Sequence, residues 1–151
     1  MLSDDKREKI LLRLEAILTG LATDDIKVYR DRAEFDYKEL PAYVLLDGTE
    51  STIIRGSDRR AAQIMTVLPQ IFWVPVPTEN PLNENMGPQL SAMRVTMIKS
   101  IMQDDTLHNI VGTNGYVEYR GMETDMQTGA EVKGQIRFDF AFAYVFDFNK
   151  L

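Results

Sequence analysis

The side chains that most often carry out chemistry are sparse in this sequence. His108 is the only histidine among the 151 residues, and there is no cysteine. This composition excludes thiolate metal sites and Cys–His pairs, and it leaves little scope for a Ser–His–Asp triad. Because His108 follows the end of an expected helix, we predict that it interacts with that helix end rather than taking part in catalysis.

Paired acidic residues occur at Asp4-Asp5, Asp24-Asp25 and Asp104-Asp105. Adjacent residues do not face one another on a helix or strand, as a carboxylate dyad would need, so we assign these pairs to helix ends and turns. The sequence has no calcium loop, GxGxxG, P-loop or GxSxG string. We therefore predict no enzyme activity, no catalytic residue and no cofactor. A magnesium or calcium site built from scattered carboxylates is a minor alternative, and no metal site is predicted.

A group of charged residues lies in the segment Thr49–Arg60, which has few apolar anchors. Its arginines can grip a phosphate backbone or an acidic protein surface, or they can simply be solvated. We predict an exposed and mobile connection here. The candidate contact residues are Arg55, Asp58, Arg59 and Arg60.

The overall composition is that of a globular protein, with 44% apolar and 26% charged residues. The formal charge of -6 argues against a surface that neutralises the phosphates of nucleic acid. No apolar run approaches the roughly 20 residues of a membrane helix, and the N-terminus lacks the pattern of a signal peptide. We expect a protein that does not enter membranes and stays in the cytoplasm where it is made.

The first half of the chain predicts one helix followed by short strands. Apolar residues recur at helical spacing over Asp4–Leu21, where Ser3 can cap the helix. Strands are predicted at Ile26–Arg30 and at Pro41–Leu46, and the turn-forming pair Asp47-Gly48 should close the second.

The second half predicts a bent strand, then helices, then further strands. Gln63–Val76 is rich in β-branched and aromatic residues, but its prolines should confine parts of it to a strand end, an edge or a bulge. A helix is predicted over Pro88–Gln103 and a further helical turn over Asp104–Val111. Tyr116–Tyr119 is typical of a strand.

The strongest pattern runs from Gln135 to Phe148, where isoleucine, phenylalanine and tyrosine occupy every even position. It predicts a long strand with one aromatic face. The small apolar residues on the other face, Ala141, Ala143 and Val145, suggest that the middle of this strand is covered on both sides, with a helix on one of them. We predict one α+β domain over residues 1–151. Its mostly antiparallel sheet contains the long C-terminal aromatic strand and packs against two main helices.

The order of these pieces resembles the tail-terminator, or minor tail protein U-like, family of long-tailed bacteriophages. The resemblance spans nearly the whole chain and rests on the order of its elements. It includes the N-terminal helix, the second helix and the aromatic strand that ends in Tyr144-Val145-Phe146. The local strings that carry it are Val28-Tyr29-Arg30-Asp31-Arg32, Leu40-Pro41-Ala42-Tyr43-Val44-Leu45-Leu46-Asp47-Gly48 and Asn114-Gly115.

The resemblance implies a structural protein without cofactor or reaction. Its subunits join into a ring, implied to be a hexamer, that caps the tail tube, ends tube polymerisation and offers a surface to the head-completion or neck protein. Such a ring lies in the virion, at the head-proximal end of the tail, and is assembled in the host cytoplasm. Six copies carry 6 × -6, a formal charge of -36, which suits a passage that DNA crosses without specific binding.

In this reading, Thr49–Arg60 becomes ordered at a contact with a neighbouring subunit or with the tube. Two alternatives stand beside it. One is another neck or head/tail-completion protein of similar size and acidity. The other is a small enzyme or ligand-binding domain whose pocket lies under the aromatic strand and uses Tyr119, Asp139 or Tyr144 as polar groups.

Overall fold

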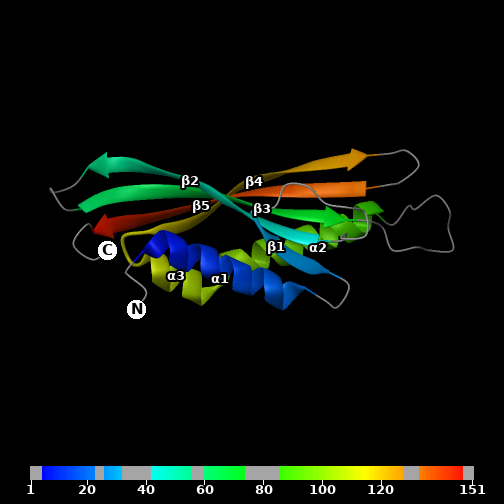
Figure 1. Ribbon diagram of the computed structural model, residues 1–151, viewed down its shortest axis with the longest axis horizontal. Helices are drawn as coiled ribbons and strands as arrows, with labels where there is room; N and C mark the ends of the chain where they lie inside the picture. The colour runs from blue at the N-terminus through cyan, green and yellow to red at the C-terminus, as the bar shows by residue number, and fades with distance from the viewer. Residues whose placement is uncertain are drawn as a thin grey trace.

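A computed structural model of the chain confirms the α+β class (Figure 1). It describes residues 5–22, 26–31, 42–55, 60–73, 86–127 and 133–147. The elements in this part of the chain are three helices and five strands, in the order α1 (Lys6–Leu21), β1 (Lys27–Arg30), β2 (Ala42–Arg55), β3 (Arg60–Trp73), α2 (Met86–Met102), α3 (Asp105–Val111), β4 (Tyr116–Gln127) and β5 (Lys133–Asp147).

The strands form one sheet in the order β1-β2-β3-β5-β4. Only β1 and β2 run parallel, and the other neighbouring strands in this sheet are antiparallel. The sheet is strongly twisted, so that β2 and β4 cross in the view of Figure 1. The three described helices lie together on one side of the sheet (Figure 1).

The core lies between these helices and the facing side of the sheet. Helix α1 contributes Ile10, Leu11, Leu14 and Leu18, all fully buried, which confirms the predicted amphipathic helix. Its N-cap is Asp5 and not Ser3, which lies outside the described residues. The Asp5 carboxylate accepts a hydrogen bond from the backbone N–H of Glu8 at 3.3 Å, which satisfies one of the free donors of the first turn.

Strand β5 confirms the aromatic pattern. Ile136, Phe138, Phe140, Phe142 and Tyr144 are at most 1% exposed and belong to the same core cluster as α1. On the other face Ala141 and Ala143 are also buried, as predicted. In the described part of the chain, however, no helix covers that second face (Figure 1).

The predicted end of β2 at Asp47-Gly48 is wrong. The strand continues to Arg55, and the pair produces a shift in the β2–β3 register between Leu46 and Thr49. A Cβ on Gly48 would overlap the backbone carbonyl of Thr66 on β3, so glycine is needed for the close approach of two strands rather than for a turn.

The predicted loop over Thr49–Arg60 is also wrong for most of its length. Residues 49–55 pair with β3, and Arg60 begins that strand. Residues 56–59, between the two strands, lie outside the described residues. Thr49, Thr52 and Ile54 are β-branched residues that suit a strand, and this signal outweighs the polarity of the segment.

Pro69 is not at an edge. It lies within β3, the middle strand of the sheet, opposite Leu45 of β2. The missing N–H is tolerated because the pairing of β3 with β5 is interrupted at Leu68 and Pro69 and resumes in the same register at Gln70. Pro75 and Pro77 lie outside the described residues.

The remaining helices and strands occur where the sequence predicts them, but their lengths differ from the prediction. Helices α2 and α3 confirm the predicted second helix and its further turn, with Met97 and Ile101 of α2 in the core. Strand β4 is longer than predicted and runs to Gln127. A bulge between Tyr119 and Gly121 interrupts its pairing with β5.

Candidate functional site

Of the four predicted contact residues, the structure describes the backbones of Arg55 and Arg60, at the ends of two neighbouring strands. Arg55 is the last residue of β2 and pairs with Ala61, whereas Arg60 is the first residue of β3 and pairs with Asp147 of β5. The structure thus brings the backbones of Arg55 and Arg60 to one end of the sheet. Asp58 and Arg59 lie outside the described residues.

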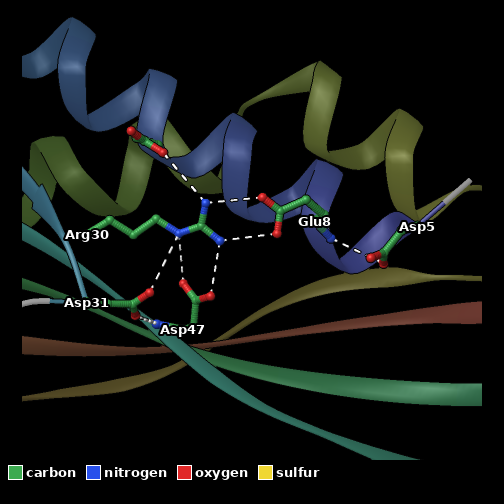
Figure 2. Close-up of polar contacts among 6 residues, drawn as sticks. Asp5, Glu8, Arg30, Asp31 and Asp47 are labelled. Atoms are coloured by element: carbon green, nitrogen blue, oxygen red, sulfur yellow. Dashed lines mark hydrogen bonds and ion pairs between the residues drawn. The ribbon is translucent and has the colours of Figure 1, made fainter. Parts of the chain in front are cut away.

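A second charged group, which the sequence did not reveal, is centred on Arg30 at the end of β1 (Figure 2). Its guanidinium donates from Nε and Nη2 to both carboxylate oxygens of Asp47, at 2.9 and 3.0 Å. The other side of the same group donates from Nη1 and Nη2 to Glu8 of α1, at 3.1 and 3.2 Å. A carboxylate oxygen of Glu15 lies 3.9 Å from Nη1 of Arg30, and one of Asp31 lies 4.0 Å from its Nε.

The members of this Arg30 cluster come from helix α1, from strand β2 and from the end of β1. Glu8 and Glu15 are seven residues apart and so share one face of α1. Asp31 follows β1 with a φ of 55°, a left-handed conformation that Asp tolerates better than most residues. In this conformation the Asp31 N–H donates to the Leu45 carbonyl and its carboxylate accepts from the Asp47 N–H, each at 2.8 Å.

The electrostatics of the cluster are those of a structural clamp. Hydrogen bonding to Arg30 lowers the pKa of Asp47 below its ordinary value, and the Asp47 and Glu8 carboxylates raise the pKa of Arg30. A carboxylate held this way is a poor base, and a guanidinium in such an environment does not release its proton. The arrangement ties α1 to β1 and β2 and is not suited to proton transfer.

Further ion pairs extend the clamp along α1. Arg7 donates to the Gly48 carbonyl at 3.0 Å and lies 3.8 Å from Glu50. Arg13 donates to both carboxylate oxygens of Asp104, and Asp104 also caps α3 through the Leu107 N–H at 2.9 Å. The helix layer is therefore fixed both to the sheet and to itself.

Asp5, Asp104 and His108 take the structural roles predicted for them, whereas Asp4 lies outside the described residues. Asp5 and Asp104 are helix N-caps. The Nε2 of His108 lies 2.8 Å from the carbonyl oxygen of Met102, the last residue of α2, so His108 interacts with that helix end. Asp24 and Asp25 lie outside the described residues.

The aromatic face of β5 is packed into the core. Tyr144 is 1% exposed, and burial raises the pKa of its hydroxyl well above the ordinary range. Tyr119 packs on Phe140 with ring centroids 5.4 Å apart. Asp139 points to the other face, where a groove of about 430 Å³ is lined by Arg120, Gly121, Met122, Glu123, Arg137 and Asp139.

The charged side chains of this groove include both signs, and Arg137 is paired with Glu123 at 3.1 Å. Across the described ranges, no three His, Asp or Glu side chains gather as a metal ion would require. None of the helices in these ranges has the length and apolar character of a membrane span.

Comparison with known proteins adds no relative. No protein-family model matches the chain, and no curated protein matches it.

Sequence reasoning missed the Arg30 cluster because its partners are distant in the chain. Glu8 and Asp47 are 22 and 17 residues from Arg30. A weak signal was present, since two glutamates share one face of α1 in a region that also has to contact the sheet. Only the parallel pairing of β1 with β2 brings Arg30 and Asp47 together.

Proposed function

We propose that this protein is a structural subunit of a phage tail terminator, which forms a ring on the head-proximal end of the tail tube. In this role it ends tube polymerisation and presents a surface to the neck or head-completion protein. The subunit acts by binding other subunits and not by catalysis. Its ring is located in the virion.

The main support is that the strings behind the resemblance occur in ordered elements that pack as one α+β protomer. Val28–Arg30 lies in β1, Ala42–Gly48 lies in β2 and Tyr144–Phe146 lies in β5. The Arg30 cluster gives two of these strings a shared role, because it joins the end of β1 to the Asp47 region of β2. These contacts build a rigid body of the kind that a ring needs.

A further argument comes from the two faces of the protomer. The helices cover one side of the sheet, and no described helix covers the other (Figure 1). Such a body has two different outward surfaces, and subunits that meet through two different surfaces form closed rings when the rotation between them closes. Six copies of 17.3 kDa would give a ring of about 104 kDa.

The direct test is the effect of the purified protein on polymerising tail tubes. A terminator shortens the tubes in proportion to its concentration, and electron microscopy shows a ring at one end of each tube. Tubes of unchanged length with bare ends would refute termination. Binding to the head connector but not to tubes would identify a neck protein instead.

The predicted contact residues are tested separately by changing Arg55, Arg59 and Arg60 together to alanine. If these arginines contact a neighbouring subunit or the tube, the triple variant folds normally but loses tube capping. Normal ring formation and normal capping by this variant would show that the arginines are not essential contacts.

A further inference from the structure

A patch of apolar side chains lies on the face of the sheet that points away from the helices. The strand register aligns Ala62 with Val145, and Ile64 with Ala143 and Tyr116, across three neighbouring strands. These residues alternate with core residues such as Met65 and Phe142, so they belong to the opposite face. We call this set the outer-face patch: Ala62, Ile64, Tyr116, Ala143 and Val145.

In the centre of the outer-face patch, a small side chain lies between two larger ones. Ala143 is only 4% exposed and has a larger neighbour on each adjacent strand. One of them is Tyr116 of β4, which is 46% exposed, and the other is the half-buried Ile64 of β3. Tyr116 is the exposed member of the patch, and Ala62, Ile64 and Val145 are half-buried. Apolar side chains gathered in this way on one face are typical of protein–protein contacts.

Helix α2 presents a matching surface on the other side of the same protomer. Val95 is 48% exposed, the highest value among the exposed large hydrophobic residues of the described chain. Its exposed neighbours on α2 are uncharged apart from Lys99, whereas Met97 and Ile101 point into the core. The exposed residues around Val95 are Ser91, Ala92, Thr96 and Lys99.

We propose that α2 of one copy packs on the outer-face patch of the next copy in the ring. This inference rests on the proposed function for the closed ring, and it names the partner of each surface. The two-layer protomer gains a third layer from its neighbour, so that the sheet is covered on both sides. Because the two surfaces differ, each subunit offers one to each neighbour, as a head-to-tail ring requires.

Charge and spacing support this arrangement over a random apolar contact. Val95 and Lys99 are four residues apart on a helix, about 6 Å along its axis. Tyr116 and Glu118 are two residues apart on a strand, about 6.6 Å. With Val95 on Tyr116, Lys99 therefore comes within reach of Glu118, whose side chain is 48% exposed even though Arg120 lies 3.8 Å from it.

Cysteine cross-linking tests the contact without tail tubes, because the natural chain has no cysteine. In an equal mixture of the single variants Val95→Cys and Tyr116→Cys, we expect disulfide-linked heterodimers. Neither variant alone should form linked dimers. The double variant should give a ladder of linked oligomers that ends at the closed ring.

A matched control is Leu12→Cys on α1, which replaces another exposed apolar residue of the helix layer, 41% exposed. Mixed with Tyr116→Cys, it should give no specific cross-link. Charge reversal supplies a second test that leaves the core untouched. Lys99→Glu should weaken self-association, and Glu118→Lys in the same chain should restore it.

Several results would overturn the inference. They are dimers of Val95→Cys alone, equal cross-linking by the Leu12→Cys control, or a mixture of Val95→Cys and Tyr116→Cys that gives no cross-link either free or on capped tube ends. The outcomes also separate this contact from tail termination. Predicted cross-links in a protein that leaves tube length unchanged would keep the contact and refute the proposed function. Tube capping without these cross-links would refute the contact alone.

Discussion

Replacing Arg30 with alanine should destabilise the fold by exposing four carboxylates to one another. The natural guanidinium lies within 4.0 Å of all of them and joins α1 to two strands. Without it, mutual repulsion adds to the loss of hydrogen bonds. The four carboxylates are those of Glu8, Glu15, Asp31 and Asp47.

The size of the effect follows from the contacts and their exposure. Arg30 makes four hydrogen bonds of 2.9 to 3.2 Å to Asp47 and Glu8. Hydrogen bonds to charged groups contribute about 1.5–3 kcal/mol each in favourable settings. The side chains here are 25–37% exposed, so solvent screens them and the bonds do not add. We expect a loss of about 2 kcal/mol, or a fall in Tm of roughly 4–8 °C.

The loss of stability caused by Arg30→Ala should become smaller as the pH falls. The pKa of Asp47 in the folded protein lies below its ordinary value of 3.8, because the ion pair favours the charged carboxylate. The stability that this shift contributes is present above the unfolded-state pKa and disappears as the pH falls through the folded-state pKa. The difference between the natural protein and Arg30→Ala should therefore be smaller at about pH 3 than at pH 7.

Urea unfolding followed by circular dichroism at both pH values measures this difference. Arg137→Ala is the matched control, since this arginine also pairs with a carboxylate but is 48% exposed. The control should shift the unfolding free energy by no more than about 0.5 kcal/mol. An unchanged unfolding midpoint for Arg30→Ala at pH 7, or an equal loss of stability at both pH values, would show that the ion pairs of Arg30 do not stabilise the fold as proposed.

Four further substitutions probe the core, the β2 irregularity with its control in α1, and the helix junction. Phe140→Ala removes a fully buried ring and should cost about 3–5 kcal/mol in denaturant unfolding, and a cost below 1 kcal/mol would contradict the core assignment. Gly48→Ala should cost about 1–3 kcal/mol, because its Cβ would overlap β3. Gly20→Ala is the control, because a Cβ at Gly20 meets no atom within 4 Å, and it should stabilise α1 by up to about 1 kcal/mol. Equal effects of the two substitutions would contradict the close approach of Gly48 to β3. Asp104→Ala removes both the N-cap of α3 and the ion pair with Arg13, and thermal unfolding should show a loss of stability of about 1–3 kcal/mol. This loss should become smaller in acid, because the pKa of Asp104 is lowered in the folded protein. A loss that is unchanged in acid would exclude the ion pair as its cause.

The sequence predicted the elements whose signal is local. Helix α1 and strand β5 follow from apolar spacing over more than ten residues, and the structure confirms both. His108 and Asp104 were assigned to helix ends because their neighbours in the chain defined those ends. In each case the information needed lies within a few turns or one strand.

Features that depend on a neighbouring strand were missed. Nothing within β2 shows that Gly48 must approach β3, so the sequence alone favours a turn at Asp47-Gly48. Pro69 is tolerated in a middle strand because β3–β5 pairing is locally interrupted there, which no pattern within β3 could show. The Arg30 cluster likewise depends on contacts between three separate elements.

The central claim is that the chain closes into a ring that caps tail tubes. The most direct measurement is the mass of the purified protein by light scattering, alone and with tail tubes, followed by electron microscopy of the products. We predict a closed assembly near 104 kDa, six times 17.3 kDa, either free or on tube ends. A monomer that persists at high concentration and leaves tube ends bare would contradict the claim.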